Sequence, residues 1–134
     1  MVCFDTDFLI AYLQRNPHAI RKLELLKTEH RDNNSASACT TSINAVELYK
    51  GVYRVTNRER EAAKVKQLMD SLDLLTLDHE SARLAGELDA ATKSKAIGDL
   101  DLIIASIALT NSQTLITRNV KHFERVPGLT VESW

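Results

Sequence analysis

Three acidic residues of this chain stand at the edges of apolar segments, where a charged side chain needs a specific partner. Asp5 follows the apolar residues 2–4, Glu47 lies between Val46 and Leu48, and Asp101 precedes the apolar run that begins at residue 102. A carboxylate beside buried surface needs hydrogen bonds or a cation, and converging carboxylates repel one another unless a metal ion lies between them. The three acids are therefore candidate ligands of a hard divalent cation.

Such a cation suggests a reaction class. Mg²⁺ and Mn²⁺ take oxygen ligands, and Mg²⁺ commonly binds to a few carboxylates together with phosphate oxygens of the substrate. A metal of this kind lowers the pKa of a bound water and neutralises the charge that grows on a leaving oxygen. The three acids thus suit hydrolysis of a phosphodiester.

The elements that must position these acids follow from the apolar periodicity. Strands are predicted at residues 1–4, 38–41, 74–77, 114–117 and 129–131, and helices at 6–13, 18–30, 42–55, 57–72, 78–95, 99–111 and 120–125. Ser42, Asn57 and either Asp78 or Ser81 are the expected helix caps, and the polar run 31–37 is an expected loop. Strands that alternate with helices predict one three-layer α/β/α domain over residues 1–134, with a mostly parallel sheet.

In such a sheet, ligands bind where the strands end at their carboxyl edge. Asp5 and Asn119 fall at the carboxyl ends of predicted strands, whereas Asp99 and Asp101 fall in the first turn of a predicted helix. The chain order therefore places several polar side chains at the edge where a ligand is expected.

Composition limits the function classes. The 134 residues are 44% hydrophobic, and 17 basic residues against 18 acidic ones leave no overall charge that would attract nucleic acid. Cys3 and Cys39 show no Cys-x-x-Cys spacing, the start of the chain does not resemble a signal peptide, and the longest apolar run, residues 102–109, is too short to span a membrane. We expect a cytoplasmic protein without a membrane segment.

Four segments together resemble a known family. Residues 2–10 (VCFDTDFLI) look like the opening of PIN-domain nucleases, residues 41–48 (TSINAVEL) like their second motif, and residues 97–105 (IGDLDLIIA) like their third. Residues 115–119 (LITRN), with His122-Phe123 and the segment 126–129, resemble the closing region. Within the family, the chain is most similar to the VapC-type toxins of toxin–antitoxin pairs.

The resemblance implies roles for particular residues. Asp5, Glu47 and Asp101 match the three acidic metal positions, Thr6 matches the hydroxyl that follows the first acid, and Asn119 matches a place where many members carry a fourth acid. It implies a PIN-like fold, an Mg²⁺- or Mn²⁺-dependent ribonuclease with water as nucleophile, and Thr6 or Thr117 as residues that orient solvent.

Two features leave the ligand set open. Asp7 stands where many relatives have asparagine, and Asp99 competes with Asp101 for the third ligand position. Side chains two positions apart on a helix point about 200° away from each other, so only one of the two acids faces the site. Alignment with the apolar run 102–105 favours Asp101.

The resemblance also implies partners: an RNA substrate, a cognate antitoxin that lays a helix between the first helices and inserts an arginine into the acidic site, and a second copy of the chain. An apolar surface around Leu9, Ile10 and Leu13 is a candidate for the homodimer. The candidate phosphate contacts are Arg118, Lys50, Arg54 and Lys93.

Other interpretations remain at this stage. Asp5 followed by Asp7 also looks like the nucleophile and acid of a haloacid-dehalogenase-like phosphatase, in which Asp5 would attack phosphorus. A PIN-like module that binds a partner without catalysis is the second alternative. Structural roles are open too, because Asp5 can cap a helix, and Asp99 and Asp101 can stabilise a helix N-terminus by about 0.3–1 kcal/mol each.

Overall fold

A five-stranded parallel sheet forms the centre of the molecule. The computed structural model describes residues 1–29, 38–93 and 97–134. The strands are β1 (Val2–Phe4), β2 (Cys39–Thr41), β3 (Asp73–Leu75), β4 (Thr114–Ile116) and β5 (Val131–Glu132). They pair in the order β3-β2-β1-β4-β5, and every pair is parallel.

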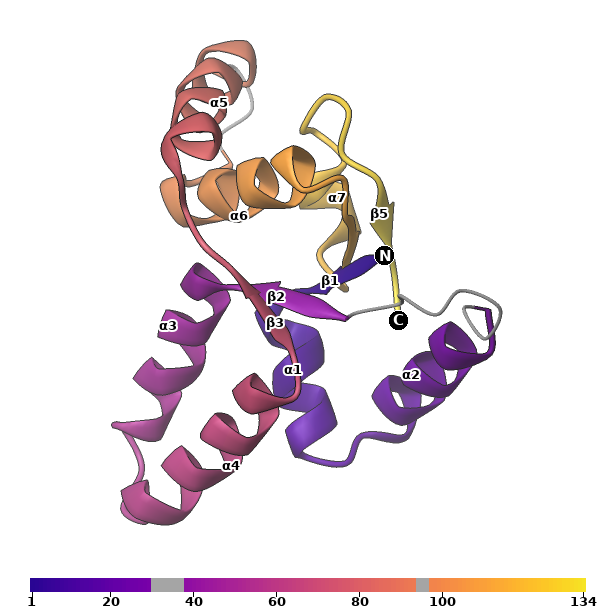
Figure 1. Ribbon diagram of the computed structural model, residues 1–134, viewed down its shortest axis with the longest axis vertical. Coiled ribbons are helices and arrows are strands. Elements are labelled where there is room, and N and C mark those ends of the chain that lie inside the picture. The colour runs from indigo at the N-terminus through magenta and orange to yellow at the C-terminus, as the bar shows by residue number, and fades with distance from the viewer. Residues whose placement is uncertain (30–37, 94–96) are drawn as a thin grey trace.

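Helices cover both faces of this sheet (Figure 1). One face carries α1 (Thr6–Leu13), α2 (Pro17–Glu29), α3 (Ser42–Val52) and α4 (Arg58–Asp70). The other carries α6 (Asp99–Thr110) and α7 (Val120–Phe123), and α5 (His79–Ala91) packs against α6 farther from the sheet. The α/β fold expected from the sequence, in which a parallel sheet is the middle one of three layers, is confirmed.

Alternation along the strands produces two hydrophobic cores. Phe4 of β1 and Ile116 of β4 point to the first face, where they pack with Phe8 of α1. Cys3 and Leu115, one residue earlier on the same strands, point to the opposite core. Because successive side chains of a strand point to opposite faces, residues of one strand supply both cores.

The order in which the chain adds strands to the sheet changes direction at the central strand, β1. From β1 it moves outward to β2 and β3, and it then crosses to β4 on the other side of β1. The carboxyl ends of β1 and β4 therefore flank the topological switch point, where open parallel sheets form their ligand crevice. Asp5 follows β1 and Thr117 follows β4 at this point.

Several predicted boundaries are wrong by a few residues. Thr41 is the N-cap of α3 instead of Ser42, which is already helical, and Asp78 caps α5 with Ser81 as its reciprocal partner. The third strand begins and ends earlier than residues 74–77, the last strand begins later than residue 129, and the third, fourth and fifth helices end before residues 55, 72 and 95. The expected loop at 31–37 lies outside the described residues.

Two further expectations about caps and surfaces fail. Asn57 occupies the N-cap position of α4 but forms no side-chain hydrogen bond there. Leu9 is only 1% exposed and belongs to the first core, so it cannot contribute to a self-association surface with Ile10. The helix face that Leu9 lies on is already used to cover the sheet.

Candidate active site

Asp5 lies at the centre of the crevice and is held there by two side chains from distant segments. It occupies the N-cap position of α1, but its carboxylate does not cap that helix. Instead, Asn44 Nδ2 donates to Asp5 Oδ1 at 2.9 Å, and Thr117 Oγ1 donates to Asp5 Oδ2 at 2.7 Å. The structural alternative for Asp5, a side-chain helix cap, is therefore not realised.

The surroundings of Asp5 make its charge costly. The side chain is buried, with 8% of the residue exposed, and burial raises the pKa of Asp5 from 3.8 to about 6. Hydrogen bonds from Thr117 and from the backbone of Thr6 lower this pKa, while the charges of Asp7 and Asp101 raise it. The carboxylate is thus oriented by donors, but its charge lacks compensation.

Asn44 is a site residue that the sequence analysis did not single out. It is fully buried in the first turn of α3. Its Oδ1 accepts from Thr41 Oγ1 at 2.7 Å as part of a capping box, so its Nδ2 is turned toward Asp5 and toward Thr6 Oγ1, each at 2.9 Å. Asn44 thereby ties the start of α3 to the end of β1. The available sequence signal was Thr41 followed by an amide three residues later.

The structure brings together Glu47 and Thr6, two of the candidate site residues. Glu47 lies one turn into α3 and is half-buried, and Thr6 Oγ1 donates to Glu47 Oε1 at 2.9 Å. Because Thr6 accepts from Asn44, a chain of hydrogen bonds runs from Asn44 through Thr6 to Glu47. This chain fixes the orientation of a second carboxylate beside Asp5.

Asp101 and Asp99 take different environments in the first turn of α6. Asp99 is exposed, whereas Asp101 is half-buried and lies near enough to raise the pKa of Asp5. Oδ2 of Asp101 also lies 2.8 Å from Nε2 of His122, but the two atoms are not aligned as a hydrogen bond. The structure thus supports Asp101 over Asp99 as the third ligand, a choice that stays a prediction.

The segment after β4 supplies the remaining polar groups. Thr117 is fully buried, and its Oγ1 accepts from the backbone N of Asn119 at 3.1 Å. Asp7 Oδ2 accepts from Thr117 Oγ1 at 3.2 Å and from the backbone N of Arg118 at 2.9 Å. The side chain of Asn119 is exposed, so the structure places it at the rim of the crevice.

The donor set fits a divalent cation in its chemistry. None of the ion pairs among the described residues neutralises Asp5, Asp7 or Glu47 with a lysine or an arginine. Asp5, Asp7 and Glu47 each accept hydrogen bonds from donors of the chain, and within the described ranges no three His, Cys, Asp or Glu side chains lie close enough together to hold a metal ion in this arrangement. Oxygen-rich, under-compensated carboxylates at one crevice are what Mg²⁺ or Mn²⁺ prefers.

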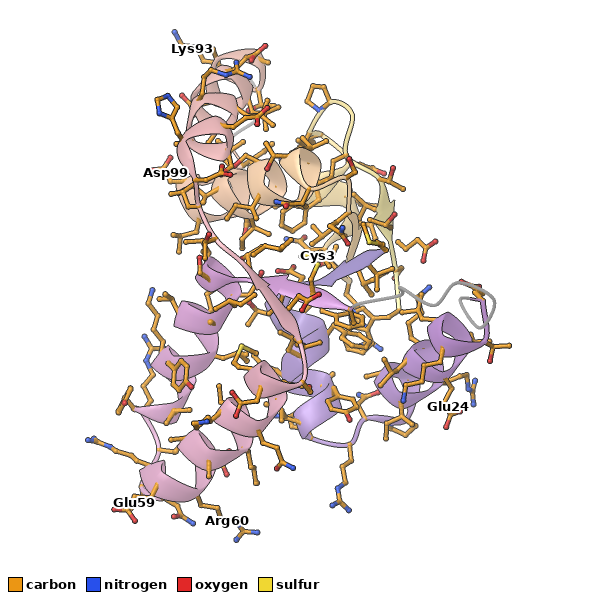
Figure 2. All side chains as sticks on the ribbon, viewed as in Figure 1. Cys3, Glu24, Glu59, Arg60, Lys93 and Asp99 are labelled. Atoms are coloured by element: carbon orange, nitrogen blue, oxygen red, sulfur yellow. The ribbon has the colours of Figure 1, made fainter. Side chains whose placement is uncertain are left out.

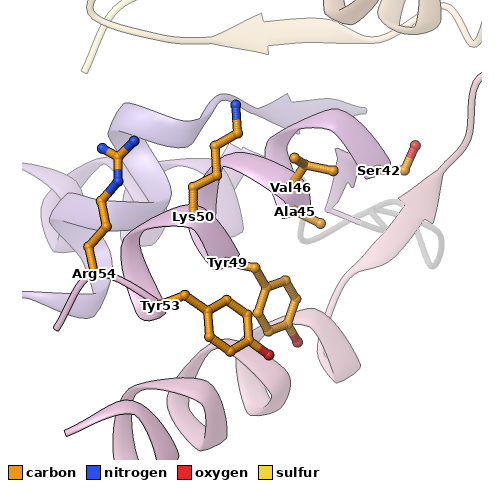
Figure 3. A pocket seen from close by; sticks show the side chains of 7 residues that line it. All are labelled: Ser42, Ala45, Val46, Tyr49, Lys50, Tyr53 and Arg54. Carbon is orange, nitrogen blue, oxygen red and sulfur yellow. The ribbon is translucent and has the colours of Figure 1, made fainter. Parts of the chain in front are cut away.

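The candidate phosphate contacts are spread over the molecule. Lys50 of α3 and Arg54, which lies just beyond the end of this helix, line a hollow of about 550 Å³ together with Tyr49 and Tyr53 (Figure 3). Lys93 projects beyond the outer end of α5, away from the sheet (Figure 2). Of the four, Arg118 directly follows a residue that contacts Asp5.

Comparison with known proteins decides the family. The sequence model described as PIN domain matches residues 2–129 of this chain. The chain belongs to the PIN domain family. The sequence-based assignment is confirmed, and the family match decides against the haloacid-dehalogenase-like alternative.

Relatives within the PIN domain family are VapC ribonucleases. The chain is 31% identical to Ribonuclease VapC2 of Rickettsia felis over 97% of this chain and 95% of the relative. It is 30% identical to the tRNA(fMet)-specific endonuclease VapC of Salmonella typhimurium, with the same coverage. The crystal structure of VapBC2 from Rickettsia felis bound to a promoter DNA fragment has a TM-score of 0.86 at 29% identity and covers 100% of this chain and 99% of its own.

Proposed function

We propose that this chain is a divalent-cation-dependent endoribonuclease and the toxin of a VapBC-type toxin–antitoxin pair, working as one nuclease domain over residues 1–134. The observation that carries the proposal is the position of Asp5, which lies at the switch point of a PIN-family sheet with Glu47 and Asp101 around the same crevice. Among the described residues, Asp5 and Glu47 are buried or half-buried without a basic partner, and Asp101 has His122 beside it, so no lysine or arginine neutralises the three carboxylates, which favours a cation.

Asp5, Glu47 and Asp101 would hold Mg²⁺ or Mn²⁺, with Asn119 at the rim. When bound, the ion supplies a water of lowered pKa and neutralises charge at the scissile phosphate. The residues of the chain supply the orientation: Asn44 and Thr117 fix both oxygens of Asp5, and Thr6 fixes Glu47. Such fixed geometry around the reacting groups lowers the entropic cost of the reaction.

An antitoxin partner is supported by a groove between α1, α2 and α4. This groove has a volume of about 820 Å³ and combines apolar with basic and acidic side chains, including Leu13, Leu23, Lys27, Arg60 and Lys64. An amphipathic helix of the partner can lay its apolar face there. The similar solved structure from Rickettsia felis is of VapBC2 bound to a DNA fragment, and a solved structure from Mycobacterium tuberculosis is described as a member of the VapBC family of toxin–antitoxin systems.

We further propose a homodimer and a cytoplasmic location. The exposed side of α3 and its C-cap residue offer an apolar surface for self-association, because Val46 is 50% exposed and Tyr53 is 62% exposed. In the described part of the chain, no helix is long and apolar enough to cross a membrane.

Cleavage of RNA tests the proposal. Wild-type protein purified free of its partner is incubated with structured RNAs, tRNA(fMet) among them, with Mg²⁺, Mn²⁺ or a chelator. We expect metal-dependent cleavage that disappears in Glu47→Gln and persists in Glu87→Gln, an exposed residue of α5. Cleavage that survives in Glu47→Gln would contradict the proposed site. The absence of cleavage by folded wild type with all RNAs would contradict the proposed activity and favour a non-catalytic binding module.

A further inference from the structure

Trp134 joins the acidic crevice to a basic side chain. Its Nε1 donates to Asp7 Oδ1 at 3.2 Å, and its ring packs edge-on against Phe8 with 5.6 Å between centroids. The guanidinium carbon of Arg118 lies 3.8 Å from the centroid of the Trp134 ring. Arg118 Nε also donates to the backbone O of Trp134 at 3.2 Å, so the stacked guanidinium is fixed at two points.

This arrangement keeps Arg118 from neutralising its acidic neighbours. The backbone N of Arg118 contacts Asp7 Oδ2 at 2.9 Å, yet the guanidinium forms no ion pair with the side-chain carboxylate of any described residue. Its two terminal nitrogens make no hydrogen bond to any described residue, and the side chain is exposed. An exposed guanidinium with open donors, fixed one residue after Thr117, is a ready partner for an anion.

A phosphate is the anion that fits this position. A nucleic-acid strand that approaches the crevice meets the negative charges of Asp5, Asp7 and Asp101, which repel its backbone. Arg118 places a positive charge at the same edge of the sheet, and its guanidinium is not paired with those acids. Because stacking on Trp134 already orders the side chain, less conformational entropy is lost when it binds.

We propose that Arg118, positioned by Trp134, binds a backbone phosphate of the RNA strand beside the acidic crevice. The identity of the strand as RNA rests on the proposed function, whereas the phosphate contact rests on the geometry of these two residues. Arg118 is the binding residue and Trp134 is a positioning residue that acts through it.

Direct RNA binding tests the proposal independently of cleavage. Fluorescence anisotropy of a fluorescein-labelled mixed-sequence RNA is measured with chelator present, over a range of KCl concentrations. We expect Arg118→Gln to weaken binding about 5- to 10-fold and to reduce the log–log salt slope by roughly 0.7–1, as for one lost phosphate contact. The matched control Arg83→Gln, on α5 and paired with Glu87, should leave both quantities unchanged.

Several results of this titration would overturn the proposal. They are an unchanged affinity and salt slope in Arg118→Gln, an equal loss in Arg83→Gln, or no binding of RNA by the wild type. Since no RNA is cut under these conditions, the result is separate from the cleavage test with Glu47→Gln. If the wild type cuts RNA, and Arg118→Gln cuts and binds RNA as well as the wild type, the proposed role of Arg118 is wrong and the proposed function still stands.

A double-mutant cycle separates positioning from direct contact. We expect Trp134→Leu to weaken binding about as much as Arg118→Gln, and the double variant to be no weaker than either within about 2-fold. Trp134→Phe keeps an aromatic face and should retain near-wild-type affinity, and Arg118→Lys should retain the salt slope. Additive losses would show that Trp134 contacts the RNA itself and would overturn its positioning role. Circular dichroism melts check that each variant is folded.

Discussion

Thr117 Oγ1 donates a hydrogen bond of 2.7 Å to Asp5 Oδ2, and this contact joins the carboxyl ends of the neighbouring strands β4 and β1. Both residues are buried. Thr117 Oγ1 also lies 3.2 Å from Asp7 Oδ2, and a hydroxyl has only one proton to donate. The shorter contact favours Asp5, while Asp7 keeps its donors from the backbone of Arg118 and from Trp134.

Replacing Thr117 with valine should raise the pKa of Asp5 further, because the hydrogen bond from Thr117 lowers that pKa. Loss of a buried hydrogen bond to a charged group costs about 1–3 kcal/mol of stability. We expect the acidic limb of the activity–pH profile to move to higher pH in Thr117→Val. Thr117→Ser retains the hydroxyl and should keep the wild-type profile. An unshifted profile in Thr117→Val would show that this hydrogen bond does not control the ionisation of Asp5.

Asp5 should make the metal-free protein less stable as the pH rises. Its pKa in the folded protein is about 6 against an ordinary value of 3.8, so the folded state binds more protons between these values. The contribution of Asp5 is therefore most favourable below pH 3.8 and is lost as the pH rises through about 6. A shift of this size corresponds to about 3 kcal/mol.

The comparison with Asp5→Asn isolates this effect from other carboxylates. An asparagine can accept from Asn44 and donate to Thr117 Oγ1, whose own proton can then turn to Asp7. In chelator at pH 8, thermal unfolding should occur at higher temperature in Asp5→Asn than in wild type, and the difference should shrink at pH 4.5. Equal stabilities at both pH values would indicate that the carboxylate of Asp5 is not strained by burial.

Asn44→Ala should impair the site as well as the fold. It removes the reciprocal cap of α3 and both donors to Asp5 and Thr6, at a cost of about 2 kcal/mol of stability. We expect RNA cleavage to fall at least about 10-fold at a temperature where the variant is folded. The matched control is Asp78→Ala, which removes the capping box of α5 and should lower stability without lowering cleavage. Equal activity in the two variants would make Asn44 purely structural.

Asp101 and Asp99 offer a direct comparison within one helix turn. Asp101→Asn should abolish metal-dependent cleavage, because it removes a proposed metal ligand that lies near enough to Asp5 to raise the pKa of that residue. Asp99→Asn removes an exposed charge near the helix N-terminus and should change stability by less than about 1 kcal/mol and activity little. Cleavage rates of the two variants at saturating Mg²⁺ provide the measurement. The reverse ranking would assign Asp99 as the ligand.

The sequence predicted the elements that carry strong periodicity and the acids that follow them. The limits of α1 and the parallel sheet follow from apolar patterns, and Asp5 follows β1 at the expected edge. The ends of the strands are predicted less accurately, because strands of two or three residues leave little pattern to count. Thr41 caps α3 because its side chain accepts from the backbone N of Asn44. The sequence pattern does not tell whether the hydroxyl of Thr41 or that of Ser42 makes this contact.

Contacts between distant segments were beyond the sequence. Trp134 reaches Asp7 across 127 positions, and Thr117 reaches Asp5 across 112. No local propensity or spacing encodes such contacts, since they form only when β4 and β5 pair on one side of β1. Leu9 was misplaced for the same reason: periodicity marks a helix face as apolar but does not tell whether the sheet or a second protein covers it.

Direct binding of Mn²⁺ is the most decisive measurement, because the proposed chemistry depends on one or two ions held by Asp5, Glu47 and Asp101. Electron paramagnetic resonance counts free Mn²⁺ in titrations of metal-free wild type, Glu47→Gln, Asp101→Asn and the control Glu87→Gln. We predict saturable binding by wild type and Glu87→Gln, weakened at least about 10-fold in each of the other two variants. Equal binding by all four proteins, or none by folded wild type, would contradict a metal site formed by these acids.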